Sequence, residues 1–167
     1  MSDINSLVAL KFDCDLEPSD RLLEELDLAR QKKQLWHNEI EATTKLLYEV
    51  CSELTVELKK HCSKIGVTIS NPVNVSEYGE RPKFNWYVSA RELPTESLFS
   101  IQTSVSIVFW GGNRRRHNVY YKDGHWTSVK VHLKSIGLSD DEPTPITIEK
   151  AAEILLADAI FCMGEHR

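Results

Sequence analysis

Along the first third of the chain, apolar residues recur at intervals of three and four, the spacing of one helical face. The series follows Pro18 and Ser19, which are typical of a helix start, and no Pro or Gly interrupts it before Gly66. The pattern therefore permits one helix over residues 19–65, roughly 68 Å long. Its apolar track consists of Leu22, Leu26, Ala29, Trp36, Ile40, Leu47, Val50 and Leu54.

A helix of this length exceeds what a compact domain of this size can cover. Two alternatives remain open: the helix pairs with another chain, or it folds back as a hairpin near residues 34–38, where weaker helix formers gather. The sustained spacing favours a coiled coil, with Lys33 at a solvated edge or tuning the register. A wider apolar stripe predicts that residues 40–65 pack on a sheet. The expected dimer contacts are Leu22, Leu26, Ala29, Trp36 and Ile40.

After Gly66 the pattern changes to the two-residue alternation of β-strands. We expect an antiparallel meander of four to five strands within residues 67–133, and weak alternation adds a short strand over residues 6–13. Loops are expected where Gly and Pro occur, over residues 78–83 and 91–97. The expected strands of the meander cover residues 67–70, 84–90, 100–110, 117–122 and 125–133.

Two turn signals set the predicted strand register. Asp123-Gly124 is a strong two-residue hairpin signal, and Gly112-Asn113 is a weaker one. The first turn predicts the opposed pairs Tyr121–Trp126, Val119–Ser128, His117–Lys130 and Arg115–His132. The second predicts Trp110–Arg115, Val108–His117 and Ser106–Val119.

Because side chains alternate between the faces of a sheet, these registers divide the meander into two faces. The core face is predicted to hold Ile101, Val105, Ile107, Phe109, Tyr120, Val129, Val131 and Leu133. The other face gathers basic and aromatic residues, which suit phosphate, carboxylate or stacking partners. The candidate binding residues there and at its rim are Trp110, Arg114, Arg115, His117, Tyr121, Trp126, Lys130 and His132.

The chain closes with a second predicted helix. Residues 140–145 are typical of a polar loop, and Thr147 is a favourable N-cap. An apolar stripe then indicates a helix over residues 147–163, ended by Gly164 and packed on the core. The predicted fold class is α+β, a single domain over residues 1–167 with a long N-terminal helix, a meander and a C-terminal helix.

Charge is unevenly distributed along the 167 residues, whose net charge is −5. Residues 67–138 hold 9 Lys/Arg against 5 Asp/Glu, a balance of +4, while both flanking segments are acidic. The same segment carries ten of the fourteen aromatic residues. This asymmetry places the expected partner-binding surface in the meander.

No motif for nucleotide binding or hydrolysis is present. His117 and His132 have no orienting carboxylate in the predicted register and no third metal ligand, so we expect no enzyme activity, metal or cofactor. The four cysteines form no C-x-x-C pair, and neither a membrane span nor a signal peptide is expected. These features favour a cytoplasmic protein.

The sequence therefore predicts a small non-enzymatic binding protein of the inhibitor, immunity protein, chaperone or adaptor type. It would engage a protein partner through the basic and aromatic face and form a homodimer through the long helix. The alternative is binding of nucleic acid, or of a nucleotide-like anion, on the same face.

Overall fold

The computed structural model describes residues 19–77, 80–131 and 142–165. The strand expected over residues 6–13 lies outside these ranges, as do His132 and Leu133. The chain forms two compact units, residues 1–39 and 40–167. The sheet and its core belong to the second unit.

Helix α2 (Asp20–Ile65) is one continuous helix of 46 residues, so the chain does not fold back near residues 34–38. The Ser19 hydroxyl caps it by accepting a hydrogen bond from the Leu22 amide at 3.3 Å. Apolar side chains of α2 become buried only from Leu47 onward, as the expected packing of its second half on a sheet requires. The buried set is Leu47, Val50, Cys51, Leu54, Thr55, Leu58 and Cys62.

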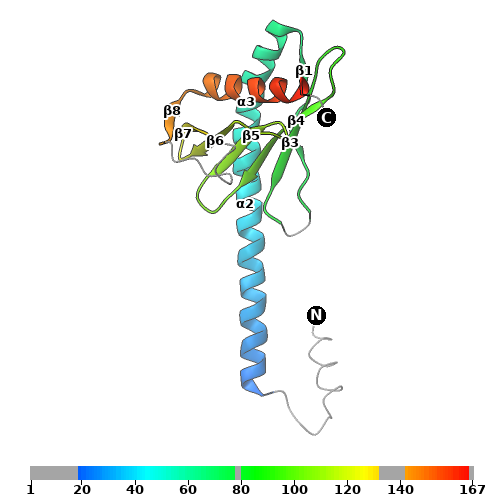
Figure 1. The fold of residues 1–167 in the computed structure, drawn as a ribbon. Helices are drawn as coiled ribbons and strands as arrows, with labels where there is room; N and C mark the ends of the chain where they lie inside the picture. Colours follow the sequence, from blue (N-terminus) through cyan, green and yellow to red (C-terminus); the bar gives the residue numbers. More distant parts are fainter. Residues whose placement is uncertain (1–18, 78–79, 132–141, 166–167) are drawn as a thin grey trace. The chain divides into compact units, whose positions relative to one another are not determined.

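The strands form one antiparallel sheet of eight, more than the four to five expected (Figure 1). Its order is β1-β3-β4-β5-β6-β7-β8, with β2 also paired to β3. The short strand β2 directly follows Pro72, and β8 contains Pro145. The sequence indicates loop at both places because proline is disfavoured in strands. The strands are β1 (Thr68–Ile69), β2 (Val73–Asn74), β3 (Lys83–Ser89), β4 (Glu96–Gln102), β5 (Ile107–Gly111), β6 (His117–Lys122), β7 (His125–Lys130) and β8 (Thr144–Ile146).

A tight turn divides the single strand expected over residues 100–110 into β4 and β5. The Thr103 hydroxyl accepts from the Ser106 amide at 3.0 Å and donates to the Ser106 carbonyl at 2.7 Å. The turn changes which residues face the core, from even-numbered positions in β4 to odd-numbered positions in β5. Ile101 and Val105 are therefore not core residues, contrary to prediction, whereas Ile107 and Phe109 are.

The hairpin between β6 and β7 follows the sequence. Asp123 and Gly124 both have positive φ, 49° and 82°, as a two-residue hairpin turn requires. The register predicted within this hairpin is confirmed for its described pairs, which include Tyr121 with Trp126 and His117 with Lys130.

Helix α3 (Ile148–Met163) has the predicted caps. The Thr147 hydroxyl accepts from the Lys150 amide at 3.2 Å, and Gly164 is the C-cap. The helix packs against β4, β5, β6 and β7. Its buried stripe includes Leu155, Leu156 and Ala159 and also one charged residue, Asp158.

The register expected from Gly112-Asn113 is wrong. Phe109 faces Val119 and Val108 faces Tyr120, three positions from the prediction, because the connection between β5 and β6 covers residues 112–116. Gly111, the last residue of β5, and Gly112, the first residue of the connection, allow close packing on α3. A Cβ on Gly111 would overlap the Leu155 carbonyl oxygen, and one on Gly112 would overlap the Cys162 sulfur.

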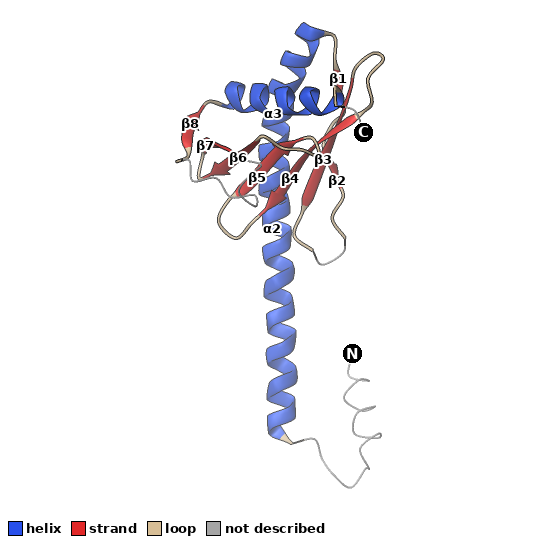
Figure 2. Ribbon diagram, viewed as in Figure 1, coloured by secondary structure: helices blue, strands red, loops and turns tan. Residues whose placement is uncertain are grey.

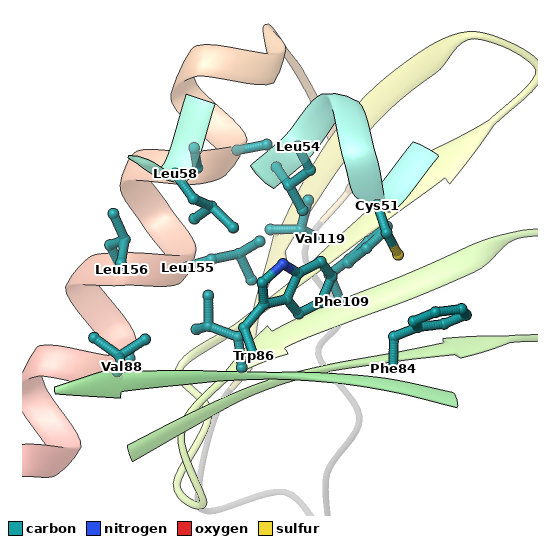
Figure 3. Close-up of a cluster of buried hydrophobic side chains, with 14 of the residues drawn as sticks. Cys51, Leu54, Leu58, Phe84, Trp86, Val88, Phe109, Val119, Leu155 and Leu156 are labelled. Carbon is teal, nitrogen blue, oxygen red and sulfur yellow. The ribbon is translucent and has the colours of Figure 1, made fainter. Parts of the chain in front are cut away.

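Both helices pack on the same face of the sheet (Figures 2 and 3). Trp86 of β3 is fully buried there, and its Nε1 donates to the Thr55 hydroxyl of α2 at 2.8 Å. Phe84, Trp86, Val88, Phe109 and Val119 point toward Leu54 and Leu58 of α2 and Leu155 and Leu156 of α3. The core is thus one layer between sheet and helices, and it excludes the predicted members Tyr120, Val129 and Val131.

Candidate protein-binding face of the sheet

The opposite side of the sheet carries a cluster of apolar and aromatic side chains that no helix of the described ranges covers (Figure 2). All are half-buried, and they extend across β4, β5 and β6. The Phe99 and Trp110 rings stack with centroids 5.5 Å apart, and Val108 lies between Ile101 and Tyr120 in the strand register. We call Phe99, Ile101, Val108, Trp110 and Tyr120 the open sheet face.

Arg115 extends this surface. Its guanidinium carbon lies 5.0 Å from the centroid of the Trp110 ring, a cation–π arrangement. Trp110 and Arg115 are therefore in contact, as expected, although Arg115 reaches the ring from the loop before β6 and not from an opposed strand position. The pair forms a flat aromatic surface with a cation on it.

The strand residues on this side of the described sheet include no Asp or Glu. Lys83 and Lys122 lie on it, and Lys83 is 3.7 Å from Glu80 in the preceding loop. This local charge is opposite in sign to the net charge of −5 of the whole chain. A carboxylate-bearing partner therefore meets attraction here and no acidic strand residue.

Four of the predicted binding residues lie on the helix side instead: Tyr121, Trp126, His117 and Lys130. Tyr121 and Trp126 are part of the core there. The shifted register places Tyr121 opposite Ile107, and Trp126 is only 8% exposed. The Trp126 ring packs 5.4 Å from Phe109 and 5.1 Å from Tyr121. One edge of Trp126 borders a hollow of about 640 Å³ between the hairpin, β8 and the start of α3. Both residues are therefore core elements, not members of the open sheet face.

His117 belongs to a polar cluster around Asp158, which is fully buried in α3, while the His117 and Arg116 side chains are partly exposed. The His117 Nδ1 lies 3.1 Å from each carboxylate oxygen, and the His117 amide donates to Oδ2 at 2.9 Å. Arg116 donates through Nε at 3.1 Å and through its amide at 3.3 Å. The prediction that no carboxylate accompanies His117 is wrong because the acid comes from α3 and not from the sheet.

Asp158 accepts two backbone amides as well as two side chains, so it fixes the end of the 112–116 connection against α3. The signal in the sequence is one acidic residue inside an otherwise apolar helical stripe. A buried carboxylate requires such partners. The cluster supports the loop that presents Arg115 to the open sheet face.

The other two arginines of the connection also have internal partners. Arg114 lies 3.4 Å from Glu165, and Arg116, bound to Asp158, is stacked 4.2 Å from the Phe161 ring. Arg114 and Arg116 are thus committed to carboxylates of the same chain. Lys130 is exposed opposite His117, and His132 lies outside the described residues.

The described cysteines, Cys51, Cys62 and Cys162, are buried free thiols. Burial raises the pKa of the Cys51 thiol to about 12, and it raises the pKa values of Cys62 and Cys162 as well. Within residues 19–77, 80–131 and 142–165, no three His, Cys, Asp or Glu side chains are grouped to hold a metal ion. The helices in these ranges include none long and apolar enough to span a membrane.

Cys51 provides a test of this burial. Between pH 9 and pH 12 an unfolded chain ionises this thiol while the folded protein keeps it protonated, so the free energy of unfolding falls as pH rises. The expected contribution is about 1 kcal/mol between pH 9 and pH 10 and approaches about 1.4 kcal/mol per pH unit above pH 10. Denaturant unfolding of wild type and Cys51→Ala at pH 8, 9 and 10 checks it. A slope equal in both proteins would show that Cys51 ionises normally.

Comparisons with protein-family models, with curated proteins and with solved structures find no match to this chain.

Proposed function

We propose that this chain is a non-enzymatic binding protein that engages a protein partner through the open sheet face. The observation that carries this proposal is the aromatic surface formed by Phe99, Trp110 and Arg115, on the side of the sheet where the described residues place neither a helix nor an acidic strand residue. Aromatic and Arg side chains dominate binding energy at protein interfaces. A rigid sheet presents them without a large ordering cost on association.

The chemistry of this surface indicates the partner. Phe99, Ile101 and Val108 would contact apolar groups, and the Arg115 guanidinium, stacked on a ring, would bind a carboxylate with its N–H groups. We therefore propose a protein surface or segment that combines apolar and acidic residues. Such a partner matches the positive charge that Arg115 and Lys122 give to this side of the sheet.

The alternative, a nucleic acid or nucleotide-like anion, draws on the basic residues 114–117. A polyanion binds through cations that release its counterions. Arg114 is paired with Glu165 and Arg116 with Asp158. These ion pairs reduce the positive charge that the 112–116 connection presents to phosphates. We therefore favour the protein partner.

The test compares matched aromatic substitutions in affinity capture from a cell extract. Trp110→Ala removes the ring under Arg115. Phe161→Ala removes a ring of α3 that is 43% exposed and stacks on the Arg116 guanidinium. We expect wild type and Phe161→Ala to retain the same protein and Trp110→Ala to lose it. With that protein purified, calorimetric titration is expected to give at least about tenfold weaker binding for Trp110→Ala.

Equal affinity of Trp110→Ala and wild type would contradict the proposal. So would saturable quenching of tryptophan fluorescence by a short oligonucleotide in a sample that captures no protein. Trp110 lies outside the core, so its variant is expected to keep the circular dichroism spectrum of wild type, while loss of the half-buried stack with Phe99 lowers the thermal midpoint without unfolding the protein at the assay temperature.

A further inference from the structure

We infer that two copies of this chain associate through the first turns of α2 as a parallel, in-register coiled coil. The inference concerns the first compact unit and does not depend on the proposed function. Its core residues are Leu22, Leu26, Ala29 and Lys33, separated by steps of four, three and four residues. That spacing is the heptad repeat of a two-helix seam.

The exposure of these residues separates them from the rest of the same track. Leu47, Val50 and Leu54 continue the spacing and are buried in the core. Leu22 is 61% exposed, Ala29 is exposed and Leu26 is half-buried. The track is therefore packed in one unit and continues into the other with Leu22 and Ala29 exposed, where a second copy supplies the matching seam.

Lys33 indicates the number of helices. With Leu22 and Ala29 at d positions, Leu26 and Lys33 occupy a positions. In a two-stranded coiled coil the Lys33 ammonium reaches water past the seam, whereas a larger bundle would enclose it. A single Lys at an a position is a known determinant of register and oligomeric state.

Charges beside the seam fit the parallel arrangement. Glu25 stands at a g position and Arg30 at the following e position. In a parallel, in-register pair, Glu25 of each copy meets Arg30 of the other, which gives two ion pairs per dimer. Arg30 lies 3.9 Å from Asp27 in its own helix, so its side chain is already directed along the helix surface.

The first measurement is the molar mass of the full chain by sedimentation equilibrium from about 1 to 200 μM, a range chosen to include moderate dimer affinities. The expected mass of wild type is twice the 19.1 kDa of one chain. Leu26→Asp is expected to give the monomer mass. Leu28→Asp is the matched control, because Leu28 is 48% exposed two residues further on the same helix and lies off the seam.

A monomeric wild type over this range would overturn the inference, including the case in which residues 1–18 of the same chain cover the seam. A dimer that survives Leu26→Asp, or that Leu28→Asp disrupts equally, would overturn the assignment of the seam. Circular dichroism at 222 nm confirms that both variants keep α2.

Orientation is tested with Ala29→Cys in a Cys14→Ser background, where the remaining cysteines are buried. Parallel, in-register helices place the two Ala29→Cys thiols together, so mild oxidation is expected to yield a covalent dimer, and Leu28→Cys is not. Arg30→Glu is expected to weaken dimerisation about two- to tenfold, and adding Glu25→Arg to restore it. No cross-link at position 29 from a dimeric sample would overturn the parallel arrangement.

Discussion

Replacing Asp158 with alanine is expected to lower the free energy of unfolding by about 3–5 kcal/mol. The carboxylate is fully buried and accepts from the Arg116 and His117 amides, from Arg116 Nε and from His117 Nδ1. Its removal leaves two backbone amides and two side-chain donors without their acceptor, and the partly exposed Arg116 guanidinium without its counter-charge. The loss is large because several donors depend on one group.

Chemical denaturation followed by tryptophan fluorescence measures this effect. Glu153→Ala is the matched control, because Glu153 is an exposed acid of the same helix that lies 3.4 Å from Lys150. Its expected cost is within about 0.5 kcal/mol. A loss for Asp158→Ala as small as that of Glu153→Ala would show that the 112–116 connection is held by other contacts.

Gly111→Ala is expected to destabilise the fold by about 3 kcal/mol, although the backbone at this position does not have the positive φ that favours glycine. The added methyl group would overlap the Leu155 carbonyl oxygen and lie 3.1 Å from the Ala159 amide nitrogen. These atoms belong to the α3 backbone and cannot move aside as a side chain does. The whole helix must therefore move away from β5.

The matched control is Gly164→Ala, also a glycine of negative φ, where the new Cβ finds its nearest neighbour at 3.6 Å. This change is expected to be neutral or stabilising by up to about 1 kcal/mol, because it restricts the unfolded chain. Thermal and denaturant unfolding distinguish the two variants. Similar midpoints for both would show that α3 stands further from β5 than the structure places it.

Much of the architecture could be predicted from the sequence because local signals specified it. Residues 19–65 carry a helical period without a breaker, Asp123-Gly124 has one favourable hairpin geometry, and Thr147 is a strong N-cap. Each signal depends on neighbouring residues alone. The helix, the β6–β7 register and the start of α3 are accordingly as expected.

The assignment of faces was not predictable in the same way. The turn at residues 103–106 keeps an alternating pattern of side chains, so two strands resemble one, and the change of side is invisible in the sequence. A tight turn and a close approach to a helix both require glycine, so Gly111 and Gly112 in the sequence do not show which of the two is present. The register there depends on α3, which is about 40 residues away in sequence.

The candidate site shows the same division. Trp110 and Arg115 are in contact as expected. Trp126 and Tyr121, which were expected on the binding surface, lie in or against the core. The carboxylate beside His117 was missed because an acid in an apolar helical stripe has no visible partner until the fold is known. Local patterns identified the residue types of the surface, and the tertiary packing decided which of them share it.

The one-sided core also separates stability from recognition. Residues that hold the fold together point toward α2 and α3, whereas Phe99, Ile101 and Val108 point away from them on the same strands. Substitutions on the outward positions therefore leave the packed layer intact. Natural selection, or a combinatorial library confined to these alternate positions, can thus change what the protein recognises while the scaffold stays the same.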